Sequence, residues 1–301
     1  MEKLPQIKQT LSEIDGRVPA ALRAALRIGY SSSPVPADIA SFAASLQQPP
    51  ATDAAAATDE ELTNGAAPPP ALRIRFGSCY LPLHDHDAHF GLADAGVLGV
   101  ADGVGVYARF RVDAGAFARV LMASALAGAA VEPACPRALL AAAYERAVAS
   151  GAPGASTAVI ISLAGDALRW AYVGDSGFAV LRGGRIVCRS EPQQRSFNSP
   201  CRLSGGGEVP AGDSDGVAVA RVGEVVVRDG DVVVVGTDGL FDNVRDEQLE
   251  VVVRMGTRLG FSTKNMADIL AGVAFETSRR ILMGKPDDIT VLVAFIVHSD
   301  S

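Results

Sequence analysis

From Ile74 onward the chain consists largely of short apolar runs divided by glycine or aspartate, and runs rich in valine and isoleucine predict β-strands. The predicted strands cover residues 97–100, 158–163, 168–173, 178–181, 217–222, 232–235 and 290–297. The stretch LRGGRI, after the fourth of these runs, predicts a hairpin turn. Apolar residues at helical spacing predict helices over 114–130, 136–150 and 265–282. This order of elements predicts a predominantly antiparallel α+β sandwich rather than a βαβ repeat.

Residues 1–70 differ in composition from the remainder of the chain. The stretches SSSPVPADIA, QQPPATDAAAATDEE and NGAAPPP offer few apolar side chains that could pack together. We predict a flexible, alanine- and proline-rich N-terminal segment over 1–70, with a short helix at 19–28, and one globular domain over 71–301. The N-terminal residues show no clear targeting segment, because they lack a central apolar run and contain acidic side chains.

The composition narrows the class of partner. A formal net charge of -7 argues against nucleic acid and against a polybasic membrane anchor. No run approaches the roughly 18 apolar residues that a transmembrane helix needs. The four cysteines have no CxxC spacing, so we expect reduced thiols rather than a disulfide framework. We therefore expect a soluble, monomeric intracellular protein, with the cytosol or nucleus favoured, whose partners are proteins or small molecules.

Aspartates stand at the ends of three predicted strands. In GTDGLFDNV, Asp238 follows a buried apolar run, and in VADGVG a second run delivers Asp102 to a strand end. In KPDDITV, Asp287 and Asp288 precede the last strand. An ionised carboxylate is costly to bury without a cation or a strong donor, although each Asp-Gly alone is typical of a turn. Three such positions together favour a site for hard divalent cations such as Mg²⁺ or Mn²⁺.

Five motifs, taken in order, resemble the PP2C-type metal-dependent serine/threonine phosphatases, and within them the branch of the yeast mitochondrial phosphatase and its plant relatives. They are GVADGVG at 99–105, GASTAVI at 154–160, AYVGDSG at 171–177, VVVGTDGLFDNV at 233–244 and KPDDITVLVA at 285–294. The resemblance runs from about Phe76 to Val297. It implies two antiparallel β-sheets packed face to face and flanked by helix pairs.

The resemblance also implies a two-metal site and a phosphoprotein substrate. Asp102 would bridge two Mn²⁺ or Mg²⁺ ions, and the backbone carbonyl of Gly103 would bind one of them. Asp238 and Asp287 would complete the protein ligands of the other. A hydroxide bridging the ions would attack phosphoserine or phosphothreonine, so that no side-chain nucleophile is needed.

Three further acids and one histidine have a weaker place in the resemblance. Asp175 in GDSG matches an acid sometimes linked to a third metal, and Asp288 stands where the wider family usually has asparagine. Family members usually carry a Glu-Asp pair that follows a phosphate-binding basic residue. Matching Asp87 to that aspartate puts His86 in place of the glutamate. The nearest basic candidates are Arg73 and Arg75.

The same histidine-rich run leaves a zinc site open as an alternative. His84-x-His86-Asp87-x-His89 superficially resembles the HxHxDH signature of metallo-β-lactamase-like hydrolases, and imidazoles at this spacing can share a zinc ion. The aspartate stands one place too early for that signature. A polar loop that lines the phosphatase cleft explains the run more simply.

The missing glutamate leaves a second alternative from another class, a catalytically weak or inactive PP2C-like module that binds phosphoproteins. The acids that remain at 102, 238 and 287 favour an active enzyme instead. An irregular basic stretch over 190–210 is either a loop that holds a phosphopeptide or a solvated loop. Arg189 precedes it, and Arg195 and Arg202 lie within it.

Overall fold

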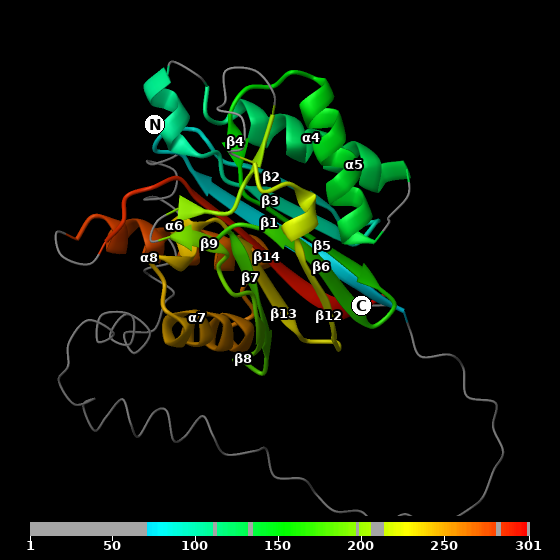
Figure 1. Ribbon diagram of the computed structural model, residues 1–301. Coiled ribbons are helices and arrows are strands. Elements are labelled where there is room, and N and C mark those ends of the chain that lie inside the picture. The colour runs from blue at the N-terminus through cyan, green and yellow to red at the C-terminus, as the bar shows by residue number, and fades with distance from the viewer. Residues whose placement is uncertain are drawn as a thin grey trace, which may run out of the picture.

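The computed structural model describes residues 71–110, 113–131, 135–196, 199–205, 214–280 and 284–299. The predicted N-terminal segment over 1–70, with its short helix at 19–28, lies outside these residues, so the domain boundary stays a prediction. Within the described residues two β-sheets lie face to face between two pairs of helices (Figure 1). This confirms the predicted α+β sandwich of antiparallel sheets flanked by helices.

Each of the two large sheets has five strands in the described residues, and all neighbouring strands are antiparallel. The first sheet has the order β1 (Leu72–Leu81), β14 (Ile289–His298), β13 (Val232–Gly236), β7 (Gly177–Arg182) and β8 (Arg185–Arg189). The second has the order β12 (Arg221–Val226), β6 (Ala167–Val173), β5 (Ala158–Ala164), β3 (Val97–Ala101) and β2 (Ala88–Leu92). Two short pairs are β9 (Gln194–Ser196) with β10 (Ser199–Pro200) and β4 (Ala155–Ser156) with β11 (Leu203–Ser204).

Helix pairs cover the outer faces of both sheets. The helices α4 (Ala116–Val131) and α5 (Pro136–Ala149) pack on the second sheet, and α7 (Asp246–Arg258) and α8 (Thr263–Ser278) cover the first (Figure 1). The other helical segments are η1 (Gly105–Phe110), η2 (Val217–Val219) and the single turn α6 (Asp238–Phe241). None of the helices in the described part of the chain is long and apolar enough to cross a membrane.

The inner strands send alternate side chains into two different core layers, as the pleat of a β-strand requires. On β5, Ile161 packs between the two sheets, whereas Ile160 packs against the α4–α5 pair. On β13, Val233 packs between the sheets and Val234 against the α7–α8 pair. Because both faces of these strands are buried, they read in the sequence as continuous apolar runs rather than as an apolar–polar alternation.

Most of the predicted elements are found close to their predicted bounds. The helices predicted over 114–130 and 136–150 are α4 and α5. The third is α8, which ends at Ser278, and residues 281 and 282 of the predicted range lie outside the described part. The predicted hairpin turn joins β7 to β8, where Gly183 and Gly184 have φ values of 57° and 74°. Glycine is favoured at both positions because larger residues rarely adopt positive φ.

One predicted strand is wrong, and three of the longer elements were not predicted. Residues 217–222 contain a 3-10 turn over Val217–Val219, and the strand β12 begins only at Arg221. The longer elements that were missed are β1, β2 and α7, and the short segments η1, β4, β9, β10, β11 and α6 were not predicted either. In α7 the sequence EVVVR favours a strand by propensity, but Val252 and Val253 are buried in the core beside α8. Tertiary burial thus outweighs the local preference of valine for strands.

Candidate functional site

Antiparallel pairing gathers five aspartates at one edge of the sandwich. In the first sheet β13 ends beside the start of β14, so Asp238 emerges near Asp287, and β7 begins beside the end of β13, just after Asp175. In the second sheet β2 begins opposite the end of β3, so Asp87 and Asp102 flank the same end of that pair. The electrostatic influence of the other four on Asp102 shows that they share one region. Residues from distant parts of the sequence therefore form one acidic site.

A cleft of about 630 Å³ opens at this edge. The four residues predicted as metal ligands, Asp102, Gly103, Asp238 and Asp287, all lie in its lining. The lining also contains basic or imidazole side chains from three other places in the chain, namely His84, His86, Arg202 and Lys285. The cleft thus combines carboxylates with groups that are able to attract an anion.

Asp102 is held at the end of β3 by Thr157. The backbone N–H of Asp102 donates to Thr157 Oγ1 at 3.1 Å, and the backbone N–H of Thr157 donates to the Asp102 carbonyl at 2.9 Å. Thr157 Oγ1 in turn lies 2.6 Å from Ser176 Oγ, which ties β3 to the GDSG turn. Burial, with added repulsion from neighbouring carboxylates such as that of Asp238, raises the pKa of Asp102 well above its usual range. A bound cation would relieve that repulsion.

Two glycines that follow site aspartates are required by close approaches of other backbone segments. A Cβ atom on Gly103 would lie 2.4 Å from the carbonyl oxygen of Ala114 and 2.7 Å from that of His86. A Cβ atom on Gly239 would lie 2.0 Å from the carbonyl oxygen of Asp288. Larger residues at these positions would push the neighbouring backbone away. The Asp-Gly pairs are therefore packing requirements of the site as well as turns.

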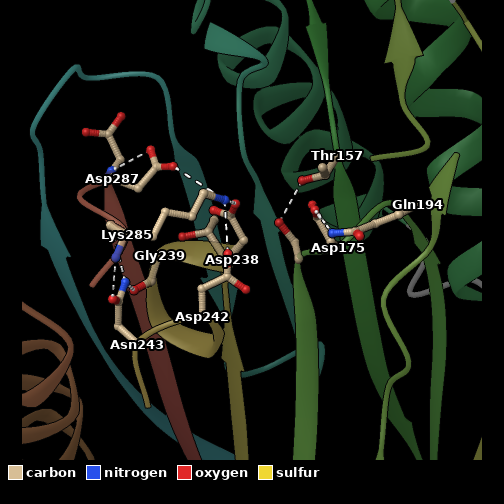
Figure 2. Close-up of polar contacts among 12 residues, drawn as sticks. Thr157, Asp175, Gln194, Asp238, Gly239, Asp242, Asn243, Lys285 and Asp287 are labelled. Atoms are coloured by element: carbon tan, nitrogen blue, oxygen red, sulfur yellow. Dashed lines mark hydrogen bonds and ion pairs between the residues drawn. The ribbon is translucent and has the colours of Figure 1, made fainter. Parts of the chain in front are cut away.

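Asp238 is the first residue of α6, and its two carboxylate oxygens differ in their partners. Oδ2 accepts from the ammonium of Lys285, whereas Oδ1 is buried without a hydrogen-bond partner in the described structure (Figure 2). Burial together with the charge of Asp238 raises the pKa of Asp287 to about 6. Asp238 and Asp287 thus present electron pairs that a cation could use.

Asp87 is a buried carboxylate held by two threonines. Its Oδ2 accepts from Thr237 Oγ1 at 2.9 Å and from Thr290 Oγ1 at 2.8 Å, and its Oδ1 has no partner in the described structure. Burial raises the pKa of Asp87 well above its usual range, and the two hydroxyl donors offset only part of that effect. The threonines precede α6 and begin β14, so Asp87 connects the second sheet to the first.

Asp288 makes a different set of contacts from the other acids. Its Oδ1 accepts the backbone N–H groups of Leu83, His84 and Asp85 at 2.5, 2.7 and 3.2 Å, and its Oδ2 accepts that of His86 at 2.6 Å. Asp85 adopts a left-handed φ of 66°, which aspartate tolerates better than most residues. The Asp288 carboxylate is thus satisfied by the backbone of the loop that carries His84 and His86.

Asp175 lies in a smaller pocket of about 110 Å³ beside the cleft. Its Oδ2 accepts from Gln194 Nε2 at 3.0 Å, and its Oδ1 is buried without a partner in the described structure. Burial and the charge of Asp238 raise the pKa of Asp175 to about 6. Asp242 also lines this pocket, which places a further carboxylate near Asp175.

The three histidines of the run at 84–89 do not converge. The rings of His84 and His86 stack with centroids 5.5 Å apart, whereas the ring of His89 lies edge-on to Tyr80 at 6.2 Å. In the described ranges no three histidine, cysteine, aspartate or glutamate side chains are close enough, as they lie, to hold one metal ion, and this holds for the acids of the cleft as well as for the histidines. The arrangement therefore gives no support to the alternative of a zinc site built from His84, His86 and His89. Burial lowers the pKa of His86, which favours a neutral imidazole.

The two nearest basic candidates for phosphate binding lie far along β1 from the cleft. Arg73 and Arg75 pair with Val297 and Phe295, whereas the end of β1 nearest the cleft is Leu81. Arg75 lies about 20 Å from that end, at the rise per residue of a β-strand. Arg202 does line the cleft. This position is compatible with the interpretation of its loop as one that holds a phosphopeptide.

Several functional neighbours of the site were not singled out from the sequence. Lys285 is the first residue of the motif KPDDITVLVA, and Asp242 follows Asp238 by one helical turn. Their positions in the sequence could therefore have revealed both residues. The threonines that hold Asp87 and Asp102 carried no such signal. Their role depends on contacts between strands that are far apart in the sequence.

The fold is that of known protein phosphatases. The structure of the photosystem II phosphatase PBCP matches with a TM-score of 0.65 and 28% identity, over 74% of this chain and 98% of that chain. The catalytic domain of the serine/threonine phosphatase PstP, in complex with two manganese ions, matches with a TM-score of 0.55 over 75% of this chain and 99% of that chain. At 22% identity this second likeness shows the fold alone.

Sequence relatives identify the family. Two relatives from rice (Oryza sativa subsp. japonica) carry the name putative protein phosphatase 2C with the numbers 23 and 24. The first is 48% identical over 100% of this chain and 99% of its own length. The second is 47% identical over 99% of this chain and 100% of its own length. A human PTC7 homologue is 32% identical over 75% of this chain and 82% of its own length. No family profile matches the chain.

The chain belongs to the protein phosphatase 2C family, a family of metal-dependent protein serine/threonine phosphatases. The resemblance inferred from the five motifs is thereby confirmed at the level of the family. The narrower assignment to the branch of the yeast mitochondrial phosphatase stays a prediction. The relatives do not favour the alternative of an inactive phosphoprotein-binding module, since they are named as phosphatases.

The contacts of Asp288 predict the effect of Asp288→Asn. An amide keeps only one acceptor oxygen, so at least one loop N–H loses its partner, and the free energy of unfolding should fall by about 1–3 kcal/mol. Denaturant unfolding measures that loss, and hydrogen–deuterium exchange of the amides of 83–86 should become faster. Asp94→Asn, at an exposed position, is the matched control. Unchanged exchange of these four amides would contradict the assignment of Asp288 as the anchor of the loop.

The raised pKa of Asp175 predicts a pH-dependent effect of Asp175→Asn. The folded carboxyl keeps its proton up to about pH 6, whereas an unfolded one releases it near 3.8, so this group destabilises the fold increasingly as pH rises between those values. In EDTA, Asp175→Asn should therefore raise the free energy of unfolding at pH 7.5 by roughly 1–3 kcal/mol and much less at pH 4. Urea unfolding at both pH values measures the difference. Equal stabilisation at the two pH values would show that relief of the buried charge is not its cause.

Proposed function

We propose that the cleft hydrolyses phosphoserine and phosphothreonine in proteins with two Mn²⁺ or Mg²⁺ ions held by Asp102, Asp238, Asp287 and the backbone carbonyl of Gly103. The observation that carries this proposal is the convergence of strand-end carboxylates on one cleft of a protein phosphatase 2C family member. The PstP catalytic domain, which shares the fold, is a complex with two manganese ions. Asp175, Asp288, Asp87 and His86 are the lower-ranked candidates for contact with the ions.

The donor set fits hard divalent cations. Carboxylate and carbonyl oxygens are the ligands that Mg²⁺ and Mn²⁺ prefer. Asp87, Asp175 and Asp238 each have one buried oxygen without a partner in the described structure. Asp288 is the exception, because backbone N–H groups already use both of its oxygens. We therefore assign Asp288 to the loop rather than to an ion.

Other residues of the site hold the acids in place and provide a positive charge for the phosphate. Ions bound there would lower the pKa of water and neutralise charge on phosphoryl oxygens. Thr157 fixes the backbone of Asp102, and the two threonines on Asp87 fix its carboxylate, so the acids are held in place before substrate arrives. Arg202, at the cleft wall, supplies a positive charge for the phosphate of a phosphoprotein.

The proposal extends to partners. A phosphoprotein substrate follows from the family. We further infer that the protein acts as a monomer without nucleic-acid or membrane partners, and the net charge of -7 supports the exclusion of polyanions.

Loss of a metal-binding carboxylate should abolish the activity. In Asp102→Asn, p-nitrophenyl phosphate hydrolysis with Mn²⁺ should fall at least about 100-fold, because the amide removes a negative oxygen from both proposed ions. EDTA should have the same effect on the wild type. Steady-state kinetics measure the loss, and circular dichroism checks that the fold is kept. With the exposed Asp94→Asn as control, more than half of the wild-type rate in Asp102→Asn would disprove the two-metal assignment.

The presence of His86 in the lining of the cleft predicts that the site prefers Mn²⁺ to Mg²⁺. A neutral imidazole in place of the usual family glutamate gives a hard cation one anionic oxygen fewer, and manganese accepts nitrogen ligands more readily than magnesium does. His86→Glu should therefore lower the Mg²⁺ concentration for half-maximal activity by about tenfold or more, with a smaller change for Mn²⁺. Titration of both metals against one phosphopeptide measures this, with His86→Gln as the uncharged control. An unchanged Mg²⁺ dependence in His86→Glu would place His86 away from the ions.

A further inference from the structure

The ammonium of Lys285 lies among three carboxylates, two that line the cleft and one, that of Asp242, that lines the smaller pocket. It donates to Asp238 Oδ2 and, at 3.0 Å, to Asp242 Oδ2, and it lies 3.9 Å from Asp287 Oδ2 (Figure 2). The side chain is 31% exposed, so the contacts form at the wall of the cleft rather than in bulk solvent. The single positive charge of Lys285 thus interacts with three negatively charged carboxylates.

The backbone of Lys285 is held by hydrogen bonds of its own, separate from the contacts of its side chain. Asn243 Nδ2 donates to the carbonyl of Lys285 at 2.9 Å, and the N–H of Lys285 donates to Asn243 Oδ1 at 3.0 Å (Figure 2). Pro286 follows directly and further restricts the backbone conformation of Lys285. The ammonium is therefore tethered at a fixed point, and rotations of the side chain alone can move it away from the carboxylates.

Two of the three carboxylates that Lys285 contacts, those of Asp238 and Asp287, are also proposed metal ligands. A divalent ion that takes up Asp238 Oδ2 meets the ammonium at the same oxygen. Two cations at hydrogen-bond distance from one oxygen repel each other strongly, and the divalent ion has twice the charge of the ammonium. Both cations cannot use Asp238 Oδ2 at full strength at the same time.

We propose that Lys285 is a tethered cation that competes with one divalent ion for Asp238 and Asp287, so that binding of the ion displaces the ammonium into the cleft. The inference rests on the proposed function, because it takes these two aspartates as metal ligands. Lys285 then weakens metal binding and sets the metal concentration at which the site fills. A displaced ammonium stays within the cleft that it lines, where a substrate phosphate would bind.

The other lysine of the described residues provides a matched control. Lys264 pairs with a single carboxylate, that of Asp268, at helical i,i+4 spacing and with a side chain that is 58% exposed. Neither residue of that pair lines the cleft. Removal of its charge should leave metal binding unchanged.

Direct metal titration tests the competition. Free Mn²⁺ measured by electron paramagnetic resonance, after EDTA treatment and dialysis, gives dissociation constants for the full-length wild type, Lys285→Gln, Lys285→Arg and Lys264→Gln. Lys285→Gln should bind one Mn²⁺ at least about tenfold more tightly than the wild type, because a repelling charge is removed. Lys285→Arg, which keeps the charge, and Lys264→Gln should stay within about twofold of the wild type. Equal or weaker Mn²⁺ binding by Lys285→Gln would overturn the proposal.

A second measurement on the wild type needs no variant to fold. Brief acetylation with an N-hydroxysuccinimide ester, followed by mass spectrometry of peptides, reports how accessible each lysine is. Saturating Mn²⁺ should raise the modification of Lys285 severalfold relative to EDTA and leave that of Lys264 unchanged. Equal modification of Lys285 with and without Mn²⁺, in protein shown to bind Mn²⁺, would overturn displacement. If the wild type binds no Mn²⁺ at millimolar concentration, the two-metal function itself fails, and this proposal falls with it.

Discussion

The concentration of negative charge at one partly buried edge of the sandwich is the constraint on which the remaining features of the site depend. Asp87, Asp102, Asp175, Asp238 and Asp287 come from both sheets, and burial with mutual repulsion raises the pKa of four of them. Such an arrangement opposes folding unless other interactions offset it. The two helix-covered sheets supply those interactions, since three buried apolar layers hold their strands together.

The partners of each carboxylate separate structural from functional acids. Asp231 is buried but receives two hydrogen bonds from Arg182 and one from the N–H of Arg228, and Asp288 receives four from the loop at 83–86. By contrast, Asp87, Asp175 and Asp238 each keep one buried oxygen without a partner in the described residues. A buried carboxylate with free electron pairs is costly in a protein that does not use it. Hydrogen bonding therefore sets Asp238 apart from the structural acids, whereas Asp102 and Asp287 are singled out by their place in the lining of the cleft.

The sequence was informative where a feature is local and uninformative where it depends on contacts between distant segments. Buried central strands and alanine-rich helices carry their pattern within a few residues, and the aspartates stand beside them, so the sandwich and the site acids were predictable. The helix α7 was not, because its valines favour a strand until Val252 and Val253 are seen to pack beside α8. Arg75 was a reasonable candidate for phosphate only while the register of β1 was unknown. The Lys285 contacts likewise depend on chain segments that are far apart in the sequence.

The loop at 83–86 connects two departures from the family pattern that look independent in the sequence. On the alignment that the resemblance predicts, one is His86 in place of glutamate, and the other is Asp288 in place of asparagine. Asparagine offers one acceptor oxygen, whereas four loop N–H groups reach both oxygens of Asp288. The loop thus uses both oxygens of an acid that, in the resemblance, replaces the usual asparagine. On this predicted alignment one negative charge leaves the cleft at position 86 and one enters the loop anchor at 288, so the local charge is conserved while the number of carboxylates open to a cation falls. A cleft with fewer free carboxylates binds divalent ions less strongly, and a tethered ammonium at Lys285 is then a more effective competitor than it would be in a relative with the glutamate.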